Sequence, residues 1–469
     1  MGSRKLMFET LLTLTALVLL VTIAVAYQKT RDVLHPAFFL GPLFLYGAVF
    51  DPWLVRHELD IFFPEPERVN RVLFLYLFAV TALALGLLHK RGSFTRIVRS
   101  RQSLLSGERG KLHRIGFVLA VAALGSYVYG IANVGGFEAA FSQAKGGGYA
   151  GSGYIGEAMN LGLVAVVMVA LSQHRRGLNG ESLLLVVLSL LPNLVQGTFG
   201  GRRGPLFLAI AAGSLAWMLT RARRPRFWML ASCLVVACLA VTFVWSQRKH
   251  LYLGSPDAEV RWEDFFGTLT QDDAVEGNNF IYGAAYVLAM EDSGSFTWGR
   301  ALFIDLLVRP IPRQLWPTKY EDTGATWITS NYPGLGPLTP HDWLTTVGWL
   351  PLAGSAAISI ADLFGEFGWW TVLVFYAIGR GFGWLYFLGR TRGGVWTLLS
   401  LEALIPSIYL ATQSFSAFYA RYLILALPTI IGWRLVVNTG RNRSRLPQLS
   451  DMARRTHTTT SLANHSPGA

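Results

Sequence analysis

The chain has 469 residues, of which 52% are hydrophobic and 15% are charged, and its mean hydropathy is +0.39. This composition excludes an ordinary soluble domain and indicates a protein that crosses a membrane several times as helices, because lipid offers no partner to an exposed peptide group. The net charge of +13 sits in short segments between apolar runs, where Lys and Arg mark the cytoplasmic side, so a nucleic-acid partner is disfavoured.

Apolar runs predict an all-α bundle of about 11 spans over residues 1–437, since about 20 residues are needed to cross the hydrocarbon core. In chain order they are Phe8–Tyr27, Val33–Phe50, Arg71–Leu88, Ile115–Val134, Tyr154–Ser172, Leu183–Val195, Leu206–Thr220, Phe227–Trp245, Trp369–Phe387, Val395–Thr412 and Tyr422–Val437. The first run also resembles a signal peptide, but we expect an uncleaved span. The second run is interrupted by Pro36 and Pro42, and a re-entrant segment is the alternative.

Basic clusters set the expected orientation. They lie at residues 90–114, 175–176, 221–226 and 390–392 and in the tail at 438–469. Placing all of them in the cytoplasm leaves an even number of spans between successive clusters. The segments 135–153 and 246–350 and the turn before Leu206 then lie outside, and so does the N-terminus, against the charge of Arg4 and Lys5. We expect the polar, basic tail to be disordered.

The turn Gly197-Thr198-Phe199-Gly200-Gly201-Arg202-Arg203-Gly204-Pro205 joins two apolar runs. Adjacent arginines are costly next to hydrocarbon unless they are compensated. The planar guanidinium group matches phosphate oxygens, so Arg202 and Arg203 together suit a pyrophosphate, with glycines that allow close approach of the backbone. The alternative is a tight turn whose arginines lie among lipid headgroups.

The long loop 246–350 exceeds what a passive connection needs, so we expect a cap of short helices, one of them over Gly299–Val308. Prolines after it fix an extended backbone that would position Arg309, Arg313 and Lys319, while Trp316 offers a flat face for a sugar. An interfacial anchor of tryptophan and basic residues is the alternative.

A turn-rich segment carries His341 and Asp342, either as a general base and its partner or as solvated loop residues. Asp362 and Glu366 follow on one helix face, four residues apart. Arg421, at the outer end of the last span, is a candidate partner for one of these carboxylates. Glu402 falls inside a span and should have a partner, since an ionisable group there is expensive.

These features together resemble the Wzy-type O-antigen and exopolysaccharide repeat-unit polymerases. The resemblance rests on the Gly-Gly-Arg-Arg-Gly turn, the large late loop, the string Pro312-Arg313-Gln314-Leu315-Trp316-Pro317-Thr318-Lys319, and Gly365-Glu366-Phe367-Gly368 at the next span.

The resemblance implies a bacterial cytoplasmic-membrane glycosyltransferase, facing the periplasm, which polymerises oligosaccharide units carried on undecaprenyl pyrophosphate. It implies no cofactor and no metal, with a flippase and a chain-length regulator as candidate partners. Arg202, Arg203, Arg309, Arg313, Trp316, Lys319 and Arg421 would then bind pyrophosphate or sugar, and His341, Asp342 or Glu366 would take the proton of the acceptor hydroxyl.

Two rival functions remain. A metal-dependent transferase that uses polyprenyl-phosphate sugars would need an acidic pair in an early outer loop, which Glu58 and Asp60 supply. A transporter or flippase of lipid-linked sugars would show two related halves and charges deep in several helices.

Overall fold

The computed structural model describes residues 2–89, 109–142, 154–174, 176–221, 227–247, 260–265, 278–309, 311, 315–329, 335–351 and 356–435. Every regular element within these ranges is a helix, which confirms the all-α class. The tail at 438–469, Arg313 and the side chain of Arg203 lie outside the described residues.

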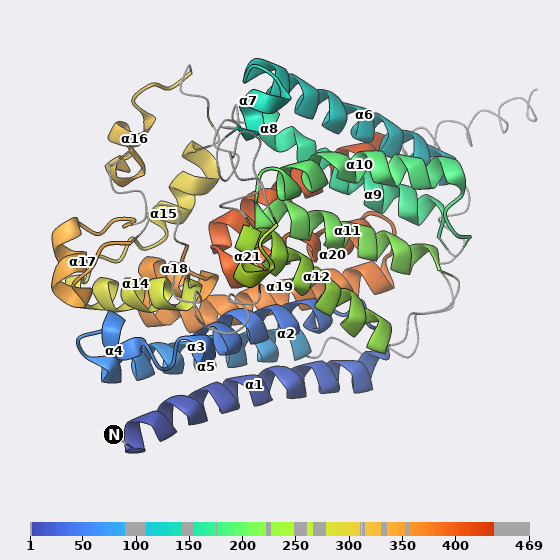
Figure 1. Cartoon of the computed structure of the whole chain (residues 1–469). Coiled ribbons are helices and arrows are strands. Elements are labelled where there is room, and N and C mark those ends of the chain that lie inside the picture. Colours follow the sequence, from blue (N-terminus) through green and yellow to red (C-terminus); the bar gives the residue numbers. More distant parts are fainter. Residues whose placement is uncertain are drawn as a thin grey trace, which may run out of the picture.

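The first half of the chain forms α1 to α12, shown in blue to green in Figure 1. Their bounds are α1 (Gly2–Thr30), α2 (Ala37–Leu45), η1 (Tyr46–Phe50), α3 (Asp51–Leu54), α4 (Leu59–Phe62), η2 (Pro66–Arg68), α5 (Val69–Leu88), α6 (Arg109–Asn133), α7 (Phe137–Phe141), α8 (Tyr154–Glu157), η5 (Ala158–Asn160), α9 (Leu161–Ser172), α10 (Gly180–Thr198), α11 (Arg203–Thr220) and α12 (Phe227–Gln247).

Short helices fill most of the later half before long helices resume. The bounds are α14 (Asn279–Ser293), α15 (Arg300–Phe303), η6 (Ile304–Val308), α16 (Lys319–Asp322), η7 (Thr326–Thr329), α17 (Pro340–Val347), α18 (Ser359–Phe367), η8 (Gly368–Trp370), α19 (Thr371–Thr391), α20 (Val395–Glu402), η9 (Ile405–Ser407), α21 (Ile408–Thr412) and a last helix, Phe415–Leu435. The short helix expected over Gly299–Val308 is present as α15 and η6.

Eight helices in the described ranges are long and apolar enough to cross a membrane, which makes this a multi-pass membrane protein. Three other expected spans coincide with α12 and with the shorter apolar helices Ala158–Ser172 and Gly204–Thr220. The second apolar run forms a continuous helix, Ala37–Leu54, despite Pro42.

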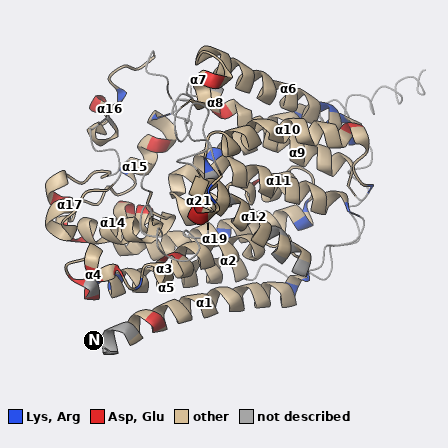
Figure 2. Cartoon of the chain, viewed as in Figure 1, with Lys and Arg blue, Asp and Glu red and all other residues tan. Residues whose placement is uncertain are grey.

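The long helices run side by side, so the molecule has two ends (Figure 1). Described Lys and Arg residues of the basic clusters gather at one of them, here called the basic end (Figure 2). His174 Nδ1 lies 2.8 Å from the carbonyl oxygen of Leu219, which brings two of these clusters together. The N-terminus lies at the opposite, distal end, with α4 and α17, which is the arrangement that Arg4 and Lys5 oppose.

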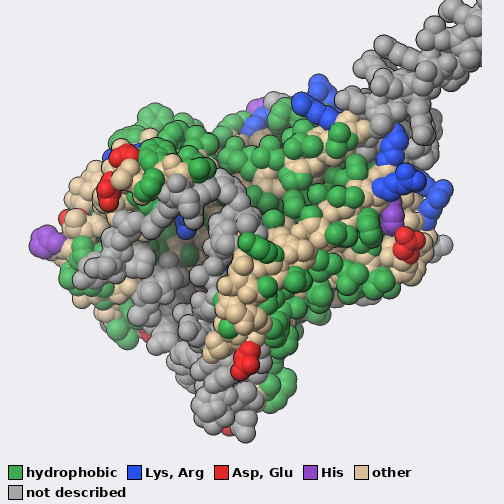
Figure 3. Space-filling view, turned by 90° about the horizontal axis from the view of Figure 1, so that it is seen from above, with side chains coloured by type: hydrophobic (Ala, Val, Ile, Leu, Met, Phe, Trp, Pro, Cys, Tyr) green, Lys and Arg blue, Asp and Glu red, His purple; other side chains and the backbone are tan. Residues whose placement is uncertain are grey.

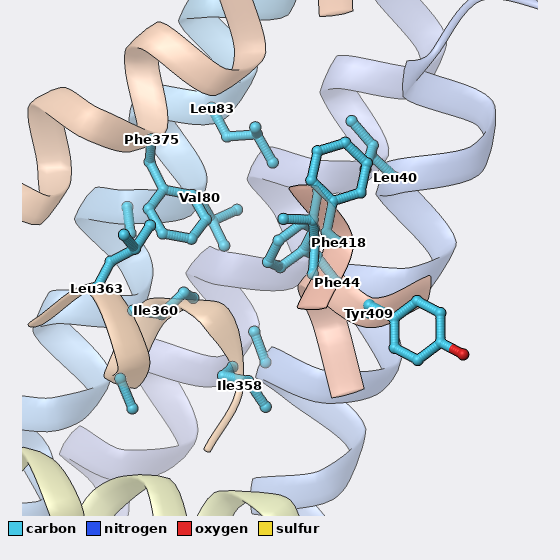
Figure 4. Close-up of a cluster of buried hydrophobic side chains, with 14 of the residues drawn as sticks. Leu40, Phe44, Val80, Leu83, Ile358, Ile360, Leu363, Phe375, Tyr409 and Phe418 are labelled. Atoms are coloured by element: carbon cyan, nitrogen blue, oxygen red, sulfur yellow. The ribbon is translucent and has the colours of Figure 1, made fainter. Parts of the chain in front are cut away.

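Close helix packing holds the bundle together. A Cβ on Gly86 of α5 would lie 2.3 Å from the carbonyl oxygen of Tyr376, and one on Gly379 of α19 would lie 2.2 Å from that of Leu83. Small residues at such crossings are a common device of membrane helices, because helix association in lipid depends on packing. Beside this crossing, apolar side chains from α2, α5, α18 and α19 form the central core (Figure 4).

The distal end is tied together by contacts between early and late residues. Arg68 donates two hydrogen bonds to the carboxylate of Asp292 at the end of α14. Trp349 Nε1 donates to the carbonyl of Phe62 at 2.9 Å. These contacts place α14 and α17 over the start of α5.

Candidate functional site

The expected arginine turn joins α10 and α11 at the distal end. The other ends of this hairpin lie at the basic end, where the amide of Gly177 donates to the carbonyl of Thr220. Gly201 has φ +57°, which favours glycine. A Cβ on Gly197 would meet Leu206 at 2.6 Å, and one on Gly200 would meet the carbonyl oxygen of Gln196 at 2.4 Å. These glycines therefore serve the packing of the turn itself, whereas the sequence suggested an approach to a ligand.

Tyr409 of α21 meets the turn from the far end of the sequence. A Cβ on Gly204 would lie 2.5 Å from the Tyr409 hydroxyl oxygen. The ring of Tyr409 is buried with the core, and its hydroxyl points away from the apolar cluster (Figure 4). The guanidinium carbon of Arg421 lies 4.1 Å from the centre of the same ring. One tyrosine thus brings Arg421 to the start of α11.

Two further charges complete what we call the arginine site, formed by Glu157, Arg202, Tyr409 and Arg421. Arg202 and Glu157 lie close enough to Tyr409 to interact with it electrostatically, and Glu157 interacts in the same way with Arg421. Arg202 is exposed and Arg421 is half-buried. Two guanidinium groups meet at one tyrosine here, and guanidinium groups bind phosphate and carboxylate oxygens well, so the site suits an anion.

Arg421 lies inside a candidate span. It is six residues into the helix Phe415–Leu435, about 9 Å from the helix start at 1.5 Å per residue. A guanidinium group at such a depth is expensive unless protein groups or water surround it. Figure 2 shows basic positions beside α21, apart from the basic end, and Figure 3 shows a basic side chain inside a hollow of the surface.

Glu366, a predicted base, is engaged with the protein. It is buried, and its two carboxylate oxygens accept from Thr297 Oγ1 at 2.6 Å, from the amide of Gly299 at 2.8 Å and from the amide of Leu302 at 2.8 Å. It lies near the end of α18, on the same helix as Asp362, as the spacing of the two predicted. The carboxylate therefore anchors the first turn of α15, and Arg421 interacts with Tyr409 and Glu157 instead.

Lys319 is likewise engaged. Its side chain is buried, and Nζ donates to the carbonyl oxygens of Val308 at 3.2 Å, Arg309 at 2.9 Å and Ile311 at 2.5 Å. An ammonium group has three donors, and all three are used here. Lys319 thus closes the carbonyl end of η6, and in this structure it offers no proton to a phosphate.

Neighbouring residues also pair locally. Trp316 Nε1 and Thr318 Oγ1 donate to one oxygen of Asp322, at 2.6 and 2.7 Å, and these hydrogen bonds lower the pKa of that carboxyl. Arg309 forms an ion pair with Asp305 at 3.3 Å, and its side chain is largely exposed. The segment α15–η7 has a small apolar core of its own, so its charges belong to a self-contained unit.

His341 and Asp342 lie on a helix, where the sequence suggested a turn-rich segment. Thr339 caps α17, with Asp342 as the reciprocal residue of a capping box. Hydrogen bonds from the side chain and amide of Thr339 hold the pKa of the Asp342 carboxyl below its ordinary value. Asp342 is therefore a weak base with a structural role, while His341 is exposed on the same turn.

Asp362 was named from the sequence but not chosen as a site residue. One of its oxygens accepts from the amide of Phe415 at 3.0 Å, and among the described residues no hydrogen bond is found for the other. Phe415 begins the helix that carries Arg421. Tyr409 and Glu157 were missed, because a tyrosine in an apolar run and a lone glutamate before one carry no signal of a shared site.

Other expectations on polar groups are partly answered. Glu402, inside a span, accepts from Thr429 Oγ1 at 2.5 Å, so its expected partner is present. Among the described residues no three His, Cys, Asp or Glu side chains gather as around a metal ion.

Comparisons with protein families, with curated proteins and with solved structures each found no match for this chain.

Proposed function

We propose that the chain is a membrane glycosyltransferase that polymerises oligosaccharide units carried on undecaprenyl pyrophosphate at the outer face of the bacterial cytoplasmic membrane. In this proposal the bundle has 11 spans and the distal end faces the periplasm. The observation that carries the proposal is the meeting of Arg202 and Arg421 at Tyr409, 219 residues apart in the sequence.

The reaction would use these groups at the donor. A hydroxyl of one lipid-linked unit attacks the anomeric carbon of another chain, the bond from that carbon to the pyrophosphate oxygen breaks, and undecaprenyl pyrophosphate leaves. Arg202 and Arg421 stabilise the negative charge that develops on the leaving group. Arg203, which begins α11, is proposed to take part with them.

The proton of the acceptor hydroxyl needs a base, and two candidates remain. His341 is exposed, and a histidine side chain ordinarily titrates near neutral pH. Asp362 has one oxygen free of hydrogen bonds among the described residues and contacts the helix of Arg421. We favour His341, one of the three bases expected from the sequence, with Asp362 as its rival in place of Glu366.

The test is elongation by purified protein in lipid vesicles. A synthetic lipid-pyrophosphate oligosaccharide should grow into polymer without added divalent metal. Strict dependence on a metal would favour the transferase that uses polyprenyl-phosphate sugars. Movement of the intact lipid-linked unit across the vesicle membrane without polymer would favour a transporter.

A pH–rate profile on the same substrate separates the two bases. A histidine base gives an acidic limb near neutrality. His341→Gln should remove this limb and lower the rate about 10²–10⁴-fold. Near-normal turnover in His341→Gln together with loss of turnover in Asp362→Asn would assign the base to Asp362.

A further inference from the structure

Three carboxamide side chains lie buried against the arginine site without the hydrogen bonds that they need. Asn193 and Gln196 of α10 are fully buried, and Asn160 of η5 is nearly so. Five of their polar atoms have no hydrogen-bond partner within the described part of the chain: both of Asn193, both of Gln196, and Oδ1 of Asn160. Leaving such an atom unpaired destabilises the folded protein, so packing between helices alone does not explain these three side chains.

Two of the carboxamides lie next to residues of the arginine site or of its turn, and the third lies beside one of these two on the same helix. Asn160 Nδ2 donates to Glu157 at 2.8 Å, and Glu157 interacts with Arg421. The carboxamide carbon of Gln196 would lie 3.5 Å from a Cβ on Gly200, two residues before Arg202. Asn193 lies one turn along α10 on the same face as Gln196, and η5 packs against this helix.

The unpaired atoms offer both donors and acceptors. Pyrophosphate oxygens only accept, so they match the guanidinium groups of Arg202 and Arg421 and leave carboxamide oxygens unsatisfied. Sugar hydroxyl and acetamido groups donate and accept, as carboxamides do. We propose that Asn160, Asn193 and Gln196 form the subsite for the sugar next to the pyrophosphate, a role that rests on the proposed function.

Entry to this subsite needs a local opening, because the carboxamides are buried. Pro192 lies inside α10 and removes one hydrogen bond of the helix just before Asn193. The last turns of α10, from Asn193 to Thr198, therefore separate from the rest of the helix more easily than an uninterrupted helix would. Sugar binding draws these turns into the open state, since only that state pairs the carboxamides.

The experiment compares the binding of two probes to the full-length protein in detergent or lipid discs. One probe is a short polyprenyl pyrophosphate, and the other is the same lipid bearing one sugar, either a hexose or an N-acetylhexosamine. The variants are Asn193→Leu, Gln196→Met and the two combined. The control is Ser182→Ala, which also removes a buried hydroxyl without a hydrogen bond on α10, about 17 Å along the helix from Asn193.

We expect wild-type protein to bind a sugar-bearing probe more tightly than the bare lipid. In the double variant the ratio of the affinity for the sugar-bearing lipid to that for the bare lipid should fall roughly tenfold, since one neutral hydrogen bond accounts for about 0.5–1.5 kcal/mol. The affinity of the double variant for the bare lipid should stay unchanged. The control Ser182→Ala should bind both probes as wild-type protein does. Thermal stability should be kept or rise, because apolar side chains replace unpaired polar ones.

Three results would overturn the inference. The first is a sugar preference that is unchanged in the variants. The second is wild-type protein that shows no preference for either sugar. The third is a loss of bare-lipid binding in the variants as large as their loss of sugar-lipid binding, which would mean that they act through the arginines. A fall in thermal stability with the sugar preference intact would assign the carboxamides to structure. Wild-type protein that binds neither probe would refute the proposed function, and the subsite with it.

Discussion

The arginine site and the α15–η7 unit both carry the cations that the sequence singles out, but they use them differently. In the α15–η7 unit each described cation has a partner within the unit. Arg300 donates to the carbonyl of Thr323, Lys319 donates to three backbone carbonyls, and Arg309 pairs with Asp305. In the arginine site the groups come from four separate elements and bring two guanidinium groups to one tyrosine. Charges with local partners build structure, whereas charges that the fold gathers from distant parts of the chain are candidates for binding a ligand.

The largest expected effect is an all-or-none difference in labelling. With Cys233 and Cys238 replaced, Phe199→Cys should react with an impermeant thiol reagent from outside, because Phe199 is exposed in the turn at the distal end. Gly200 is unsuitable, since a Cβ there would meet Gln196. The control is Gly180→Cys at the other end of α10, where a Cβ would meet nothing within 4 Å; it should react only after the membrane is opened. Reversed labelling would place the arginine site in the cytoplasm.

Next in size is the loss of rate when either arginine is removed. Arg202→Ala and Arg421→Ala should each lower the rate of polymer formation about 10²–10³-fold, as loss of one charge-stabilising contact does. Lysine at either position should restore only part of the rate, because it lacks the planar fork. Protein level in the membrane serves as the control, and normal polymer from the double alanine variant would refute the role.

A smaller effect should separate the α15–η7 unit from the site. Lys319→Met should lower the free energy of unfolding by about 1.5–3 kcal/mol, since hydrogen bonds from a charged donor are lost. The affinity of the protein that remains folded for pyrophosphate should stay the same. Glu366→Gln weakens the hydrogen bonds that hold the first turn of α15, so it should also lower the free energy of unfolding and leave the pyrophosphate affinity unchanged. Unchanged thermal unfolding with lost pyrophosphate affinity would show that Lys319 binds substrate.

The smallest effect is expected for Arg309→Ala. An exposed pair between residues four apart on a helix contributes about 0.3–0.5 kcal/mol, so activity should change less than twofold in the vesicle assay. A loss comparable to that of Arg202→Ala would extend the substrate site into the α15–η7 unit and remove the distinction drawn between the two regions.

Membrane helices were predictable from sequence because hydropathy and the distribution of basic residues report directly on lipid. The hairpin turn before Arg203 and the short helix over Gly299–Val308 followed from the same patterns. Pro42 suggested a re-entrant segment, but the helix continues, since neighbouring helices surround and support it.

The candidate site was only half predictable. Arg202 and Arg421 stood out because arginine next to hydrocarbon is costly and these two lie apart from the basic clusters, yet their meeting depends on Tyr409, whose partner Gly204 is 205 residues away. Asp342 and Glu366 stood out as titratable groups, but no sequence pattern indicated that a helix cap would engage the first and the first turn of α15 the second. Sequence shows which groups are costly, and only the fold shows which ones are compensated.

The most direct test of the account measures the affinity of purified protein for a short polyprenyl pyrophosphate and for the matching monophosphate. Wild-type protein should prefer the pyrophosphate, and Arg202→Ala and Arg421→Ala should each remove most of that preference. In the double variant the loss, expressed as a difference in binding free energy, should not exceed the sum of the two single losses. Arg309→Ala should leave it intact. Equal affinity for the two lipids, or a preference that survives the loss of both Arg202 and Arg421, would contradict the assignment of the arginine site.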